Sequence, residues 1–233
     1  MIPAIVLAGG LGTRLAAVSG GVPKPMVRVN GRPFIENVLD SLVEAGVERI
    51  FLAVSYRWEL LRDHFGPSYR GASITYSVET EPLGTGGAIL QCLQEYELER
   101  CLVLNGDTLF RIDLQALIRK HVEAHASITM ALRWLEDTSR YGSVRCDDGG
   151  HVESFQEKTG RPEPGLINGG IYVLERGAFD AVPLPARCSF ERDFLTEHLR
   201  TLRPLGVESR SYFIDIGIPE DLQRARQELA PRA

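Results

Sequence analysis

The sequence has few cysteines and places none of them in a metal-binding pattern. Cys92, Cys101, Cys146 and Cys188 form no Cys-x-x-Cys pair, which argues against a structural zinc site. Cys92 and Cys101 lie in apolar stretches, where a thiol serves as a small core side chain. The chain also lacks a basic start with a cleavage site, and it has no apolar run near the length of a membrane span. We therefore expect a cytoplasmic protein with reduced thiols and no membrane partner.

The sequence also lacks an excess of positive charge. Its formal net charge is −5, and a general nucleic-acid surface needs a basic face, so we expect no nucleic-acid partner. A small anionic ligand held by a few local cations is compatible with this charge. The 233 residues contain no repeat, low-complexity tract or linker, so we expect a single domain over residues 1–233. The oligomeric state stays open, and a homo-oligomer is one of the options.

A glycine-rich loop follows the first apolar run of the chain, which is typical of a buried strand. Gly9, Gly10 and Gly12 free the backbone to turn so that successive N–H groups point inward and hold an anion. Arg14 adds a planar, permanently charged group suited to phosphate oxygens. No lysine follows Gly12, as a Walker A loop requires, and Leu15 replaces the last glycine of the dinucleotide pattern.

On its glycines alone, this loop is equally well explained as an ordinary tight turn between a strand and a helix. Lys24 favours the phosphate site, because Pro23 and Pro25 fix the backbone on either side of it. A lysine held rigidly near such a loop is more often a ligand than a solvated side chain.

Strands and helices alternate through the first half of the chain. Apolar runs predict strands at 49–54, 73–78 and 101–104, with helices between them. This alternation indicates an α/β fold with a Rossmann-like, doubly wound and predominantly parallel mixed sheet. Ligands bind such sheets at the carboxyl ends of the strands, where the glycine-rich loop, a second glycine-rich loop at 79–89 and the turn at 105–107 fall.

The second half of the chain is richer in β-structure, with a hairpin predicted over residues 143–157. Asp113 and Ser189 are predicted N-caps of helices. His121 and His125 stand one helical turn apart, but no third ligand lies nearby in the sequence. We therefore expect them on a solvated helix face rather than in a metal site.

Two aspartates, Asp107 and Asp215, each follow an apolar strand and precede a turn. Either one alone is explained as a cap or turn residue. Together, and near a polyphosphate, they make a site for Mg²⁺, which takes one or two carboxylates along with waters and phosphate oxygens.

The order of these motifs resembles that of the sugar-1-phosphate nucleotidylyltransferases, over residues 1 to about 225. The motifs that carry the resemblance are the loop at 7–15, Pro23-Lys24-Pro25, Glu81-Pro82-Leu83-Gly84-Thr85-Gly86-Gly87, Asn105-Gly106-Asp107, Glu157-Lys158, Asn168-Gly169-Gly170 and Asp215-Ile216-Gly217-Ile218-Pro219-Glu220. Within the family the chain looks closest to the D-glycero-α-D-manno-heptose 1-phosphate guanylyltransferases. The resemblance implies a three-layer αβα nucleotidyltransferase fold. The sequence has no hexapeptide repeats, so we expect no C-terminal β-helix.

The resemblance also implies which residues bind and react. The half at 1–110 would bind the nucleotide and the half at 111–233 the sugar phosphate. Catalytic roles fall on Arg14, Lys24 and Asp107, and Mg²⁺ would be held by Asp107 and Asp215. Nucleotide binding falls on Leu7, Ala8, Gly9, Gly10, Gly12, Thr13, Arg14, Glu79, Pro82, Gly84, Thr85 and Gly106. Sugar-phosphate binding falls on Gly142, Glu157, Lys158, Asn168 and Gly169.

The implied reaction joins a nucleoside triphosphate to a sugar 1-phosphate and releases pyrophosphate. Glu79 favours GTP, because a carboxylate accepts from guanine N1–H and N2–H₂ but offers nothing to O4 of thymine or uracil. The expected product is GDP-D-glycero-α-D-manno-heptose for capsule, S-layer or other surface polysaccharide.

Three alternatives to this function stay open. The sugar could be mannose 1-phosphate, the chain could be an N-acetylmuramate- or hexose-1-phosphate uridylyl- or thymidylyltransferase, or it could be a non-catalytic sugar-nucleotide sensor. A glycosyltransferase is disfavoured, because Asn105-Gly106-Asp107 lacks the first carboxylate of a DxD motif.

Overall fold

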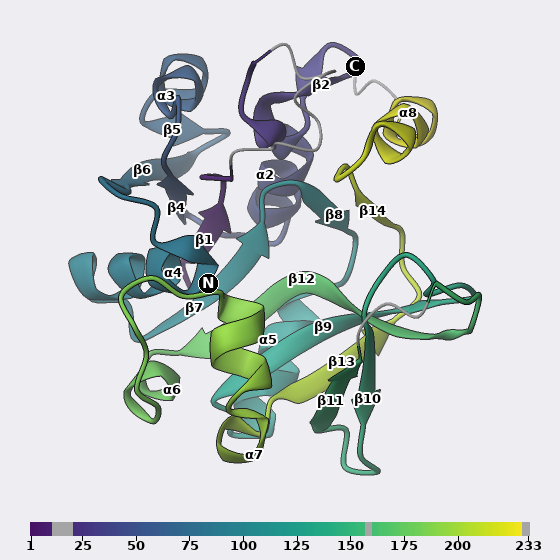
Figure 1. The fold of residues 1–233 in the computed structure, drawn as a ribbon. Coiled ribbons are helices and arrows are strands. Elements are labelled where there is room, and N and C mark those ends of the chain that lie inside the picture. The colour runs from purple at the N-terminus through teal and green to yellow at the C-terminus, as the bar shows by residue number, and fades with distance from the viewer. Residues whose placement is uncertain (11–20, 157–159, 230–233) are drawn as a thin grey trace.

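The computed structural model describes residues 1–10, 21–156 and 160–229. Its centre is a mixed sheet of ten strands (Figure 1). The first half of the chain supplies a parallel core in which the order is β7 (Arg100–Asn105), β1 (Ala4–Leu7), β4 (Arg49–Val54) and β6 (Ala72–Val78). The short strand β5 (Ser68–Tyr69) closes this edge in antiparallel pairing. The predicted parallel strands are therefore confirmed.

The second half extends the same sheet from β7. The long strand β12 (Gly165–Glu175) lies antiparallel to β7. It also pairs with β10 (Ser143–Cys146), which forms a hairpin with β11 (Val152–Gln156) at the edge of the sheet. Strand β9 (Ile128–Leu135) also pairs with β12, and β13 (Leu205–Ser209) runs parallel to β9. The predicted hairpin is confirmed, and one sheet runs through both halves of the chain.

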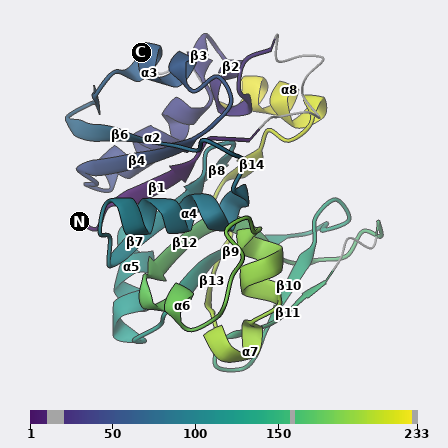
Figure 2. The ribbon, with the colours of Figure 1, turned by 60° about the vertical axis from the view of Figure 1, so that its left-hand side comes forward.

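Helices cover both faces of this sheet, which gives the three layers that the resemblance implied (Figure 2). Because side chains alternate along a strand, β1 points Ala4 and Val6 to one face and Ile5 to the other. The first face carries α2 (Ile35–Glu44), α3 (Glu59–Phe65), α5 (Leu114–Glu123) and α8 (Pro219–Glu228). The second carries α4 (Gly84–Glu95), α6 (Gly177–Asp180), the π-helical turn η3 (Phe190–Thr196) and α7 (Leu199–Leu202).

Two small antiparallel sheets complete the fold. Strand β8 (Thr108–Phe110) pairs with β14 (Phe213–Asp215), and β2 (Arg28–Val29) pairs with β3 (Arg32–Pro33). Helix α8 follows β14 and packs beside β2, so the end of the described chain returns to its first half (Figure 1). None of the helices within the described ranges is long and apolar enough to cross a membrane.

The predicted helix caps are confirmed, whereas one helix start and one histidine differ from expectation. Asp113 accepts a hydrogen bond from Ala116 N, and Ser189 accepts one from Arg192 N. The expected loop at 79–89 is shorter, because α4 already begins at Gly84. The solvated face predicted for His121 is wrong, since this side chain is buried against Thr129 on β9 and Glu175 on β12.

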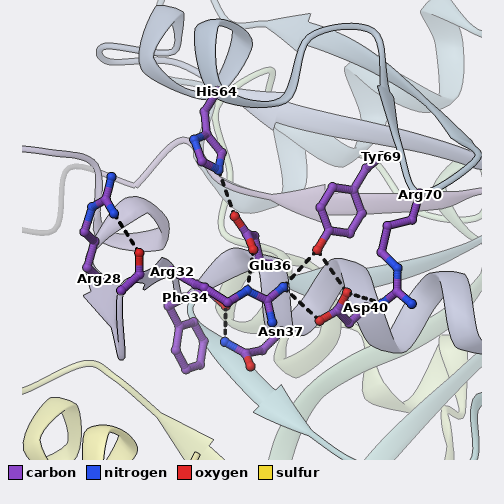
Figure 3. Close-up of polar contacts among 10 residues, drawn as sticks. Arg28, Arg32, Phe34, Glu36, Asn37, Asp40, His64, Tyr69 and Arg70 are labelled. Carbon is purple, nitrogen blue, oxygen red and sulfur yellow. Dashed lines mark hydrogen bonds and ion pairs between the residues drawn. The ribbon is translucent and has the colours of Figure 1, made fainter. Parts of the chain in front are cut away.

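A buried carboxylate anchors α2 to the edge of the sheet (Figure 3). Asp40 is 1% exposed and accepts hydrogen bonds from Tyr69 Oη at 2.9 Å, Arg70 Nη1 at 2.7 Å and Arg32 Nη2 at 3.0 Å. Burial works to raise the pKa of Asp40, but these donors outweigh it and hold the pKa below its usual value. Asp40 therefore stays ionised in the folded protein.

Replacing Asp40 with asparagine is expected to lower the free energy of unfolding at pH 7 by about 2 kcal/mol, because charged hydrogen bonds are lost at a buried site. The depressed pKa of the wild-type carboxyl contributes stability above the unfolded pKa of about 4 and loses it as the pH falls through the folded pKa. The difference in the free energy of unfolding between wild type and Asp40→Asn should therefore shrink below about pH 4. Urea unfolding at pH 7 and pH 3 measures it. Asp63→Asn, at an exposed aspartate paired with Arg62, is the control and should change stability little.

Candidate active site

A cleft of about 990 Å³ opens at the carboxyl ends of the parallel strands. This is the edge at which doubly wound sheets bind ligands. Its lining includes ten of the candidate residues named from the sequence: Leu7, Gly9, Gly10, Lys24, Glu79, Pro82, Gly84, Thr85, Asp107 and Asp215. The strands and turns that were expected to converge at one edge do so.

Lys24 joins the two candidate metal carboxylates. Its Nζ lies 2.5 Å from Asp107 Oδ2 and 3.2 Å from Asp215 Oδ1. The pairing of β8 with β14 explains this proximity, because it sets Asp215 opposite Thr108, the residue after Asp107. Lys24 itself begins the short 3₁₀ turn η2 (Lys24–Met26), whose backbone Pro23 and Pro25 restrict. Three residues from distant parts of the chain thus form one charged cluster.

The charges in this cluster alter one another's protonation. Burial works to lower the pKa of Lys24, but the carboxylates of Asp107 and Asp215 outweigh it and raise that pKa. Lys24 is therefore a cation at neutral pH. Burial, followed by the charge of Asp107, raises the pKa of Asp215 in spite of Lys24. Two carboxylates this close together favour a further cation beside them.

The described residues supply only part of a metal shell here. Among them, no group of three or more histidines, cysteines, aspartates and glutamates could hold a metal ion by itself. Two carboxylates without further protein ligands suit Mg²⁺, which keeps several waters and takes oxygens from substrate phosphates. The donor set of Asp107 and Asp215 therefore fits that ion.

Glu79 lies beside Gly9 of the glycine-rich loop and lines the same cleft. A Cβ atom added to Gly9 would lie 2.9 Å from Glu79 Oε1 and 3.1 Å from Ser55 Oγ, so a larger residue there would have to displace the Glu79 carboxylate. Ser55 Oγ donates to Gly9 O at 2.6 Å, and Leu83 N donates to Glu79 Oε2 at 2.8 Å. Burial raises the pKa of Glu79, although the bond from Leu83 opposes it. The carboxylate is thus held in place beside the loop.

A further acidic group, which the sequence did not reveal, faces the cleft from η3. Glu191 lines the cleft, and its Oε1 accepts from Tyr172 Oη and from Asn168 Nδ2, both at 2.9 Å. Burial raises the pKa of Glu191, against the hydrogen bond from Tyr172. Its one sequence signal was its place just after the predicted N-cap Ser189. Asn168 belongs to the predicted sugar-phosphate set and is connected to the cleft through Glu191.

The remaining candidates are absent from the cleft lining or lie outside the described ranges. Ala8 is buried, with its N–H donating to Ala53 O, and Gly106 N donates to Leu7 O. A Cβ atom at Gly142 would lie 2.9 Å from Gln156 O, and one at Gly169 would meet the ring of Phe110, so both glycines allow close packing. Gly12, Thr13, Arg14, Glu157 and Lys158 lie outside the described residues.

Comparison with known proteins decides the family. A model of the nucleotidyl transferase family matches residues 3–232. The chain belongs to this family. It is 40% identical to the D-glycero-alpha-D-manno-heptose 1-phosphate guanylyltransferase of Aneurinibacillus thermoaerophilus, over 97% of this chain and 97% of that protein. It is 44% identical to the protein of the same name from Campylobacter jejuni, over 94% of this chain and 96% of the other.

A solved structure of similar sequence shares the fold of this nucleotidyltransferase. The crystal structure of HddC from Yersinia pseudotuberculosis complexed with GMP-PN matches with a TM-score of 0.86 and 36% identity, over 99% of this chain and 100% of that chain. The α/β fold predicted from the sequence is therefore confirmed, and the chain is an enzyme of the nucleotidyltransferase class.

Proposed function

We propose that this nucleotidyltransferase transfers GMP from GTP to D-glycero-α-D-manno-heptose 1-phosphate, releasing pyrophosphate and GDP-heptose. The observation that carries the reaction is Lys24 held between Asp107 and Asp215 in a cleft at the ends of the parallel strands. The heptose guanylyltransferases of similar length support the choice of base and sugar. We further propose that the chain acts as a single domain in the cytoplasm, providing a precursor of surface polysaccharide.

In the proposed reaction the protein has two tasks, to align the two substrates and to neutralise their negative charge. The attacking sugar phosphate is already anionic, so no general base is needed. Negative charge builds on the leaving pyrophosphate as its bond to the α-phosphorus breaks, and positive groups placed there lower the barrier. Lys24, charged at neutral pH, supplies one of them beside the α-phosphate. Arg14 and the backbone of the glycine-rich loop hold the β- and γ-phosphates in this proposal.

Asp107 and Asp215 would hold Mg²⁺, whose chemistry here is to neutralise phosphate oxygens and fix their orientation. The two side chains are 31% and 35% exposed, so each keeps a side open to the cleft. Because both carboxylates lie close to Lys24, the bound Mg²⁺ and the Lys24 ammonium group would together neutralise the triphosphate and the attacking sugar phosphate.

Glu79 would read the base. Its Oε2 is fixed by Leu83 N, and its Oε1 lies beside Gly9, so the carboxylate is already oriented before a nucleotide binds. A fixed carboxylate accepts from N1–H and N2–H₂ of guanine. The same group faces the acceptor O4 of uracil or thymine with repulsion, which disfavours UTP and dTTP.

Glu79→Gln is expected to lower kcat/KM for GTP by about 10-fold to 100-fold, because a charged hydrogen-bond acceptor is replaced by a neutral amide. The amide also offers a donor, so the preference for GTP over UTP should shrink. Initial rates of pyrophosphate release with each nucleotide measure both effects. An unchanged GTP-to-UTP ratio would show that Glu79 does not read the base.

The sugar side of the cleft would use Asn168 with Gly142, Gly169, Glu157 and Lys158. Lys158 is assigned to the phosphate of the sugar, and the others to its hydroxyl groups. Mannose 1-phosphate is the second candidate acceptor, because its ring has the same manno configuration.

A matrix of substrates tests the function directly. Pyrophosphate release is measured with GTP, ATP, UTP and dTTP, each against D-glycero-α-D-manno-heptose 1-phosphate, mannose 1-phosphate, N-acetylmuramate 1-phosphate and glucose 1-phosphate. We expect the highest kcat/KM for GTP with the heptose 1-phosphate. Faster turnover with UTP or dTTP would overturn the guanine assignment, and no turnover with any pair would overturn the enzymatic one in favour of a sensor.

A further inference from the structure

The start of α4 and the segment before η3 dock on each other through three hydrogen bonds. Cys188 N donates to Leu83 O at 2.9 Å, and Gly86 N donates to Cys188 O at 2.9 Å. Phe190 N donates to Thr85 Oγ1 at 2.8 Å. The hydroxyl of Thr85 therefore satisfies a backbone N–H in the first turn of η3, one of the groups that a helix leaves unpaired.

Glycines permit this close contact. Gly84 has a φ of +71°, and a Cβ atom there would lie 2.5 Å from Cys188 O. A Cβ atom at Gly86 would lie 2.6 Å from Cys188 Sγ. Any larger residue at either position would push the two segments apart. The glycines of this motif thus serve the docking of η3 as well as the turn into α4.

The docked unit contacts two acidic residues of the cleft lining, Glu79 and Glu191. On one side, Leu83 N is bonded to Glu79, the proposed base reader. On the other, Phe190 is followed by Glu191, which holds Asn168 and Tyr172. Because Glu191 lies in η3 and bonds to both Asn168 and Tyr172, a shift of η3 would move it relative to both partners. Thr85 is the side chain through which α4 fixes the start of η3.

We propose that Thr85 is a positioning residue for the sugar 1-phosphate side of the site, acting through η3 and Glu191. This inference rests on the proposed function for the identity of the two substrates. This role differs from nucleotide binding, the role that the family resemblance implied for Thr85, and the test below separates the two. The observation that carries it is the bond that Phe190 N donates to the Thr85 hydroxyl, which fixes the start of η3 against α4.

The test compares Thr85→Val, which keeps the shape and removes the acceptor, with Thr85→Ser, which restores it. For Thr85→Val we expect KM for the sugar 1-phosphate to rise about fivefold, the net effect of one hydrogen bond. KM for GTP should stay within about twofold of wild type, and Thr85→Ser should resemble wild type. Thr75→Val, on β6 away from the cleft lining, is the matched control.

A second readout needs no substrate. Hydrogen exchange at the Phe190 amide should be faster in Thr85→Val than in wild type and Thr85→Ser. The proposal is overturned if KM for GTP rises instead, if serine does not rescue, or if exchange at Phe190 is unchanged. Should Thr85→Val fail to fold, Thr85→Ala removes the same acceptor without a new methyl group and is judged by the same outcomes.

Failure of the proposed function is recognised separately, in the wild-type protein. If wild type prefers another nucleotide or sugar 1-phosphate, the variants are compared with that preferred pair. If wild type turns over no pair, the exchange measurement decides whether Thr85 positions η3.

Discussion

Replacing Lys24 with alanine is expected to lower kcat for pyrophosphate release by about 10³-fold or more, because a preorganised positive charge is lost where negative charge develops. Lys24 Nζ lies within 3.2 Å of both Asp107 and Asp215. The cluster that these three described residues form contains no second cation that could replace Lys24. Its raised pKa keeps it charged across the neutral range, so the loss should be similar from pH 6 to pH 9. Continuous pyrophosphate assays at saturating substrates measure kcat directly.

Two controls separate this effect from unfolding and from simple loss of charge. The melting temperature of Lys24→Ala should stay near that of wild type, since the carboxylates it leaves are about one third exposed and can be solvated or bind cations. Lys24→Arg should recover only part of the activity, because a planar guanidinium does not place its charge at the same point. Wild-type turnover by Lys24→Ala would refute the role assigned to Lys24.

The fold was predictable where local signals agree with burial. The run from Arg49 to Val54 is apolar enough to be a central strand, and it forms β4 with those bounds. Gly46 follows α2 with a φ of +87°, the conformation that ends many helices. His121 was misjudged because its helical face contacts β9 and β12, and such a tertiary contact leaves no periodic signal in one helix.

The charged cluster was predictable for a related reason. Asp107 follows a parallel strand at its carboxyl end, and Lys24 lies between two prolines, so each carries a local mark of a rigid loop. Asp215 was found by the same strand-then-turn pattern, although only the pairing of β14 with β8 brings it to Asp107.

Other parts of the site could not be read from the sequence. Glu191 was missed because it sits in a π-helical turn, and its neighbours Asn168 and Tyr172 come from a distant strand. Two glycines were predicted too readily as ligands. Gly142 and Gly169 were predicted as ligands, but in the structure each also allows another group to approach closely, which a motif alone does not reveal.

Removing either of the carboxylates proposed to hold Mg²⁺ should also cause a large loss of activity, somewhat smaller than the loss on removing Lys24. Asp107→Asn and Asp215→Asn are each expected to lower kcat by about 10²-fold to 10³-fold at physiological Mg²⁺, because a neutral amide is a weaker ligand than a carboxylate for a hard cation. Chelation with EDTA should abolish wild-type turnover, and added Mg²⁺ should restore it. Asp63→Asn, at an exposed site bonded to Arg62, should leave the Mg²⁺ dependence unchanged.

The Mg²⁺ titration distinguishes a ligand from a residue that only orients Lys24. If Asp215 binds the ion, the Mg²⁺ concentration for half-maximal rate should rise at least about tenfold in Asp215→Asn, and excess Mg²⁺ should recover part of the rate. If Asp215 only orients Lys24, kcat falls while the Mg²⁺ requirement stays the same. The second result would leave Asp107 as the one carboxylate ligand, a number that Mg²⁺ sites with substrate phosphates also tolerate.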